Sequence, residues 1–193
     1  MSLAIVLSLA AAAAAADPTD AIEKPHRLAA CLVRASPNEV RALLDIDPRT
    51  PVFGTRLGTL VNGHGQGCKK KAKNMTVGLG VFAGVLAEAL LRARFQPDVP
   101  VEQLAPNPNR RAIPVRNSSE TVAFCTLAKA PSASSKLIAT PPGSAAEGRA
   151  LDGLRPVITS CVPQGRPINA GAPLLRSIIS LAAWRTIAAE RTR

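Results

Sequence analysis

The spacing of apolar residues along the chain predicts helices. In two stretches, apolar side chains recur every three or four residues, as on one face of a helix. In residues 75–95 this stripe consists of Phe82, Val85, Leu86, Ala89 and Leu90. In residues 171–190 it consists of Leu175, Ile178, Ile179, Ala182 and Ala183. No stretch alternates strictly between apolar and polar residues, as a half-buried strand would. We therefore predict an all-α fold.

Capping and proline signals divide the rest of the chain into short helices. Ser36, Asn117 and Ser144 each stand three residues before a Glu, the spacing of a capping box. Pro37 and Pro51 occupy first-turn positions, where the missing N–H does no harm. These signals predict two sets of four helices: 20–35, 37–45, 51–62 and 75–95, followed by 118–130, 131–139, 144–159 and 171–190.

The two sets repeat one another. "AACLVRASP" (29–37) and "AFCTLAKAP" (123–131) align at a shift of 94 residues, which places Cys31 on Cys125. At a shift of 93, Cys68 aligns with Cys161 and the two apolar stripes coincide. The matches predict a tandem duplication. We assign helical module 1 to residues 17–97 and helical module 2 to residues 118–193, and leave open whether the modules fold separately or share one core.

Residues 98–117 lie between the modules and contain Pro100, Pro106, Pro108 and Pro114. Prolines at this density exclude a continuous helix. Two interpretations remain open for this Pro-rich linker. It is either an extended connection or a strap laid across one module, because apolar residues are present to hold a strap, namely Val101, Leu104 and Ile113.

The first sixteen residues, "MSLAIVLSLAAAAAAA", carry no charge and predict a signal peptide. The apolar run is shorter than the roughly 20 residues that a membrane-spanning helix needs. It lacks a preceding Lys or Arg, and the alternative is an Ala-rich N-terminus with no targeting role. We expect an exported protein, periplasmic or secreted.

Four cysteines allow three disulfide pairings. If each module keeps its own bridge, the repeat selects Cys31 with Cys68 and Cys125 with Cys161. Export to an oxidising compartment favours these bonds, and small modules often need a covalent link for stability. The alternative is four reduced, buried cysteines.

The second module also carries a family resemblance. "LIATPPGSAAEGRALDGLRPVITSCVPQG" (137–165), together with "AFCTLAKAP" and with "LAEALLR" (86–92), resembles a group of small exported helical proteins common in sphingomonad-type alphaproteobacteria. The resemblance implies an exported, duplicated protein with paired cysteines, and it transfers no active site. The first module departs from it, since Cys68 is followed by three lysines where Cys161 is followed by Val162 and Pro163.

The net charge of +11 favours an anionic partner, such as an envelope polymer or a lipid surface. Nucleic acid is an unlikely partner, because the chain has no Tyr and its few aromatic residues are scattered. Four lysines precede the predicted apolar helix 75–95 and could contact an anionic surface. They are Lys69, Lys70, Lys71 and Lys73. The interpretation that we favour for these lysines is a solvated loop before a core helix, and contact with an anionic surface is the alternative.

No residue pattern identifies an enzyme. His64 near Cys68 is the best catalytic candidate, but Cys161 occupies the equivalent place without a histidine. Only two histidines are present, so we expect no metal and no cofactor. Asp45 and Asp47 form a close carboxylate pair that we interpret as ending a helix and shaping a turn.

The sequence therefore predicts a non-enzymatic exported protein that acts as a binding or structural unit of the cell envelope. It names no ligand and indicates no oligomeric state. The alternative is an envelope hydrolase or another enzyme with no recognisable site motif.

Overall fold

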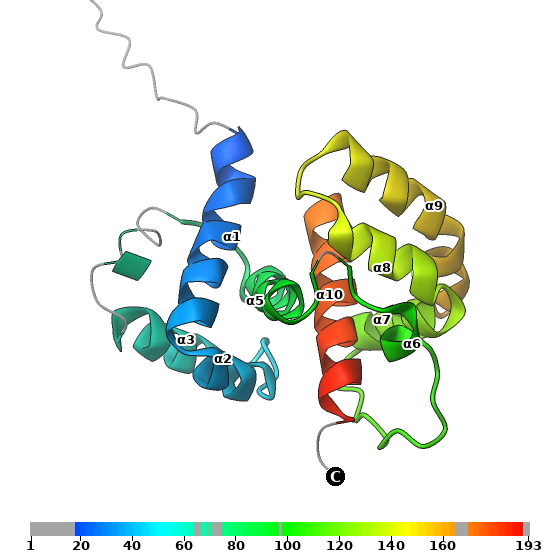
Figure 1. Cartoon of the computed structure of the whole chain (residues 1–193), viewed down its shortest axis with the longest axis horizontal. Helices are drawn as coiled ribbons and strands as arrows, with labels where there is room; N and C mark the ends of the chain where they lie inside the picture. The colour runs from blue at the N-terminus through cyan, green and yellow to red at the C-terminus, as the bar shows by residue number, and fades with distance from the viewer. Residues whose placement is uncertain are drawn as a thin grey trace, which may run out of the picture.

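The computed structural model describes residues 18–63, 67–68, 70, 75–96, 98–164 and 170–190, and these ranges contain helices and no strand (Figure 1). The all-α prediction is therefore confirmed over this part of the chain. None of its helices combines the length and the apolar character needed to cross a membrane. The predicted signal peptide, residues 1–16, lies outside the described residues.

Four longer helices form the first half of the described chain: α1 (Pro18–Ala35), α2 (Pro37–Leu44), α3 (Pro51–Gly63) and α5 (Leu79–Arg94). The last of these was predicted from residue 75, but α5 begins at Leu79. Gly78, with φ −63° and ψ 140°, is extended and precedes the first turn. The apolar stripe marked the helix correctly, but the pattern carries no signal for this late start.

Helices α6 (Val101–Leu104), α7 (Ser118–Lys129), α8 (Pro131–Ala139), α9 (Ala145–Cys161) and α10 (Ala172–Ala188) form the second half. At two of the predicted capping boxes the side chain acts as expected. Asn117 Oδ1 accepts from the Glu120 N–H at 3.0 Å, and Ser144 Oγ accepts from the Glu147 N–H at 3.1 Å.

At Ser36 the predicted capping bond is absent, although the residue does precede α2. Its backbone N–H donates to Leu32 O at 2.8 Å, which continues the hydrogen bonding of α1. Its ψ of 68° also departs from the extended conformation of Ser144, whose ψ is 158°. Because an N-cap side chain reaches the helix N–H groups from extended backbone, Ser36 does not form the bond.

The two longest apolar helices, α5 and α10, cross each other in contact in the middle of the molecule (Figure 1). Helices α1–α3 lie on one side of this pair and α7–α9 on the other. Helix α5 also packs on α1, and α10 also packs on α7. Because each has neighbours on more than one side, burial in both helices extends well beyond the predicted stripe, to residues such as Glu88 and Arg176.

Both predicted disulfides are present, so that pairing is confirmed. Cys31 is bonded to Cys68 with an S–S distance of 2.01 Å, and Cys125 is bonded to Cys161 at 2.02 Å. The first bond holds α1 to the chain that follows α3, and the second holds α7 to the end of α9. Disulfides of this structural kind persist in oxidising compartments.

Residues 98–104 lie against α8 and α10, whereas residues 106–109, 111–112 and 114–115 are exposed. Val99 and Leu104 are buried, and α6 contacts both helices. Ser135 Oγ on α8 donates to Val99 O at 2.6 Å, and Arg110 Nη2 donates to Glu190 Oε1 at 2.6 Å. The first part of the segment therefore packs as a strap. Of the apolar residues expected to hold it, Leu104 is buried and Val101 is exposed.

Candidate ligand-binding groove

A buried ion pair joins the two central helices. Arg176 on α10 donates from Nε to Glu88 Oε2 at 2.6 Å and from Nη2 to Glu88 Oε1 at 2.8 Å. The two side chains are only 3% and 2% exposed. A two-bond pair between guanidinium and carboxylate fixes orientation as well as distance, so this pair sets how α5 and α10 sit against each other.

The remaining groups of Arg176 are also satisfied within the protein. Nη2 donates to Thr140 O at 2.7 Å and to Ile138 O at 3.1 Å, two carbonyls at the C-terminal end of α8. Nη1 donates to Thr140 Oγ1 at 3.0 Å and lies 3.3 Å from Glu147 Oε1. Each guanidinium nitrogen therefore has an acceptor, and Arg176 has no free donor for a ligand.

Arg92 on α5 approaches the same place from the other side. Its Nε donates to Glu88 Oε1 at 2.9 Å, and its Nη2 donates to Thr140 O at 2.9 Å and to Ile138 O at 3.2 Å. Two arginines thus supply donors to the otherwise unpaired carbonyls that end α8, where positive charge also suits the helix dipole.

His26 on α1 stands next to this cluster, with Nδ1 3.9 Å from Glu88 Oε1. Burial lowers the pKa of His26 below its ordinary value of 6.5; Glu88 opposes this shift, while Arg176 and Arg92 add to it. The imidazole is therefore neutral at pH 7. A neutral ring can line a cavity without adding a charge to it.

A cavity of about 270 Å³ opens above the buried cluster. Its walls come from α1, from α5 and the residues before it, from α10 and from the loop between α8 and α9. Most of the lining side chains are apolar. The lining residues are Ala21, Ile22, Pro25, His26, Val77, Val81, Val85, Pro142, Gly143, Glu147, Ala172, Pro173, Arg176 and Ser177.

The loop between α8 and α9 is shaped by a tight turn. Ser144 N donates to Pro141 O at 3.2 Å, with Pro142 and Gly143 as the central residues. Gly143 has φ 73°, and Pro followed by a positive-φ glycine is the signature of a type II turn. A Cβ at Gly143 would lie 3.0 Å from Ile22 Cδ1, so the turn sits directly against α1. The turn thereby closes one side of the cavity.

A second cavity, of about 400 Å³, shares His26 and Pro142 with the first and continues along α1 and α5. It is more polar. Its other lining residues are Ala30, Val33, Arg34, Glu88, Ala89, Arg92, Ala93 and Gln96. We call the two cavities together the α1–α5 groove, with an apolar cavity at one end and a polar cavity at the other.

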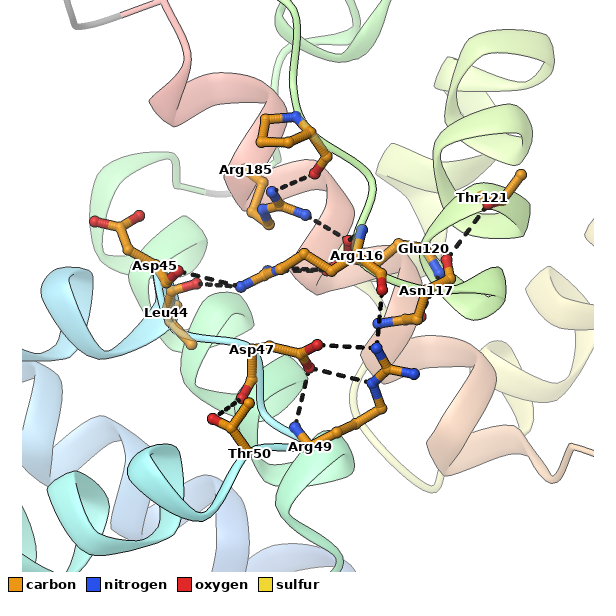
Figure 2. A network of polar contacts seen from close by, with 11 residues as sticks. Leu44, Asp45, Asp47, Arg49, Thr50, Arg116, Asn117, Glu120, Thr121 and Arg185 are labelled. Atoms are coloured by element: carbon orange, nitrogen blue, oxygen red, sulfur yellow. Dashed lines mark hydrogen bonds and ion pairs between the residues drawn. The ribbon is translucent and has the colours of Figure 1, made fainter.

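A second buried polar cluster surrounds Glu120 and has a structural role (Figure 2). Glu120 on α7 accepts from Arg116 Nε at 2.9 Å and from Arg185 Nη1 at 2.7 Å. Arg116 Nη1 in turn lies 3.4 Å from Leu44 O and from Asp45 O, at the end of α2. Burial is the largest influence on Arg185 and lowers its pKa. The cluster ties α2, α7 and α10 together.

The close carboxylate pair has the structural role that the sequence predicted. Asp45 is the C-cap of α2. Asp47 Oδ1 accepts from the Arg49 N–H at 3.0 Å, and Asp47 O accepts from the Thr50 N–H at 3.0 Å, which shapes the turn before α3. The hydrogen bond from the Arg49 side chain lowers the pKa of Asp47. Figure 2 shows this turn beside the Glu120 cluster.

The other residues singled out from the sequence fall elsewhere. Cys68 is bonded to Cys31 and offers no thiol, and His64 lies outside the described residues. Lys70 is exposed. Lys69, Lys71 and Lys73 lie outside the described residues, so their contact with an anionic surface stays a prediction. Within the described ranges no group of three or more His, Cys, Asp or Glu could hold a metal.

Sequence reasoning missed the residues that build the groove. Glu88, Arg92 and Arg176 were not identified as candidates, although Glu88 and Arg176 are charged residues within the two helices that carry the apolar stripes. A charged residue in that setting is the available signal, because such groups are rarely buried without a partner. No protein family, curated protein or solved structure matches the chain.

Proposed function

We propose that this chain is an exported, non-enzymatic binding protein of the cell envelope, periplasmic or secreted, and that the α1–α5 groove is its ligand site. The observation that carries the proposal is the apolar cavity of about 270 Å³ directly above a buried, internally paired charge cluster. Small-molecule sites are typically concave and apolar, with a few convergent polar groups.

The state of the charged groups favours binding over hydrolysis. A general acid or base must be able to give or take a proton at the substrate. Glu88 instead accepts bonds from Arg176 and Arg92, and Glu147 accepts from the Gly143 N–H and lies beside Arg176. Both carboxylates are thereby committed to holding the helices in place.

We further propose that the two halves are duplicated modules packed around one shared core. The residues at the α5–α10 contact, Gly84 and Ser177, are equivalent under the shift of 93 residues. The disulfides span 37 and 36 residues, and the last helix packs on the first helix in both halves. The buried apolar side chains of the two halves belong to one cluster, which supports the shared core.

Export is supported by the two disulfides and by the uncharged apolar run at residues 1–16. The net charge of +11 and the lysines Lys69, Lys70, Lys71 and Lys73 support a location beside an anionic envelope polymer or lipid surface.

The proposal is tested by an apolar fluorescent probe, 1-N-phenylnaphthylamine, titrated into the purified, oxidised protein. We expect saturable binding with an increase in fluorescence. Val81→Trp should fill part of the apolar cavity and abolish binding. Val52→Trp is the matched control, because Val52 is 56% exposed on α3 and does not line the groove. Absence of saturable binding by the unmodified protein would overturn the proposal.

A further inference from the structure

The polar cavity of the α1–α5 groove contains positive charge that the protein does not neutralise. Arg34 on α1 is exposed and has no polar partner among the described residues. Arg92 uses Nε and Nη2 in bonds to Glu88 and to the α8 carbonyls, whereas Nη1 makes no such bond there. The Arg92 side chain is 42% exposed. Both arginines can therefore donate to a ligand.

The charged groups that line the whole groove also sum to a positive charge. Three guanidinium groups, those of Arg34, Arg92 and Arg176, stand against two carboxylates, those of Glu88 and Glu147. His26 adds no charge at pH 7, because its pKa is lowered by burial. One positive charge is left in excess, and it lies on the polar side of His26 rather than in the apolar cavity.

The apolar cavity has the opposite character. Ile22, Val77, Val81 and Val85 form much of its wall, and the charged groups at its floor are already paired. Its volume of about 270 Å³ lies just below the range of about 300–1,000 Å³ found for drug-sized ligands. This size suits a single chain of methylene groups and is too small for two.

We infer that the α1–α5 groove binds a free fatty acid with a single alkyl tail, with the tail in the apolar cavity and the carboxylate against Arg34 and Arg92. The inference rests on the proposed function and names the class of ligand for the same site. The tail buries apolar surface, the favourable term for such a ligand. The planar guanidinium group of Arg34 can hold a carboxylate through two parallel hydrogen bonds, and Arg92 can add one from Nη1.

The headgroup is tested by comparing dodecanoate with dodecanol, each below its aggregation limit, by displacement of 1-N-phenylnaphthylamine. We expect the acid to bind at least about tenfold more tightly, since hydrogen bonds between charged groups contribute about 1.5–3 kcal/mol, or about 10–150-fold in affinity. Arg34→Glu should remove this preference and leave dodecanol binding unchanged. Arg56→Glu is the matched control, an exposed arginine on α3 outside the groove, and should retain the preference.

The tail is tested with saturated acids of increasing length. Each added methylene should raise affinity about fourfold, from about 0.8 kcal/mol per buried CH₂, until the apolar cavity is full. Val81→Leu adds less volume than Val81→Trp and should leave a smaller cavity. The acid that binds most tightly should then have a shorter chain. Affinity that is independent of chain length would overturn the placement of the tail.

The outcomes separate this inference from the proposed function. If dodecanoate and dodecanol bind equally, or if the probe binds and neither compound displaces it, the fatty-acid inference is wrong and the proposed binding function stands. If neither the probe nor any acid binds, both are wrong.

Discussion

A Cβ atom placed on Gly84 would lie 2.3 Å from the Cα of Ser177, so α5 and α10 cross with their backbones in direct contact. No side chain fits between them at this point. Because the backbones are so close, the residues on either side of this point are tightly packed. In interiors of that density, even one added methyl group changes the stability. Glu88 lies one turn along α5 from Gly84, so the glycine also places the ion pair with Arg176.

Gly84→Ala should therefore lower the free energy of unfolding by about 1–3 kcal/mol, the usual effect of overpacking. Gly80→Ala is the matched control in the same helix, because a Cβ there meets nothing within 4 Å. The control should be neutral or slightly stabilising, since Ala favours helix over Gly by about 1 kcal/mol. Urea denaturation followed by circular dichroism measures both, and equal stability of the two variants would contradict the close contact.

Glu88→Gln removes the negative charge that two arginines share. Arg176 would then be buried with a weaker partner, and we expect a loss of about 3–5 kcal/mol, as for other broken buried pairs. Glu23→Gln, on the exposed face of α1 beside Arg27, should change stability by about 1 kcal/mol or less. Denaturation midpoints that fall equally in both variants would show that Glu88 does not hold the helices.

The two disulfides should contribute almost equally to stability. They close loops of 37 and 36 residues, and in the chain-entropy model the contribution depends on the length of the loop. Replacing Cys31 and Cys68 with Ala, or Cys125 and Cys161 with Ala, should each cost about 2–5 kcal/mol. Thermal melts of the two double variants provide the comparison. Clearly unequal losses of stability would mean that the contribution of at least one bond does not depend on loop length alone.

The lowered pKa of His26 predicts a pH dependence. Because its folded pKa is below 6.5, the unfolded chain binds the proton more readily than the folded protein does. Stability should therefore fall as the pH drops from about 6.5 towards the folded pKa, and this contribution should then level off. His26→Gln should flatten the change between pH 7.5 and pH 5. If the urea midpoints of the two proteins change equally with pH across this range, His26 is not the source of the pH dependence.

If the lysine cluster recruits an anionic surface, replacing Lys69, Lys70, Lys71 and Lys73 with Gln should greatly reduce co-sedimentation with anionic vesicles. The attraction is about 1 kcal/mol per basic residue near such a surface. Binding of the unmodified chain should weaken as salt rises through about 0.15 M, where charges beyond about 8 Å are screened. Equal sedimentation of the two proteins would leave the lysines without this role.

Much of the helical structure could be predicted because its signals are local. The stripe from Phe82 to Leu90 located α5, and Asn117 and Ser144 marked the starts of α7 and α9 through bonds to residues three positions away. The disulfide pairing followed from the predicted repeat, which rests on the sequence alone. Ser36 failed as a cap because its N–H still donates to Leu32 O and continues α1, which the spacing of a Ser and a Glu does not indicate.

The groove could not be predicted in the same way. Its residues come from α1, α5, α10 and the loop after α8, and only the packing of these elements brings His26 close to Glu88. The sequence shows that Arg176 is charged and that most of the residues around it are apolar. It does not show that Glu88, 88 residues earlier, faces it across a helix crossing. The long-range ion pairs could therefore be identified only from the folded structure.

Each disulfide closes within its own half of the chain, and neither bridges the contact between α5 and α10. The backbone through residues 98–117 is consequently the one covalent connection between the two halves. A single proteolytic cut there would turn the protein into two separate disulfide-closed fragments held by non-covalent packing alone. Reassociation of such fragments would be bimolecular, so the stability of the nicked protein would depend on its concentration, whereas that of the intact chain would not.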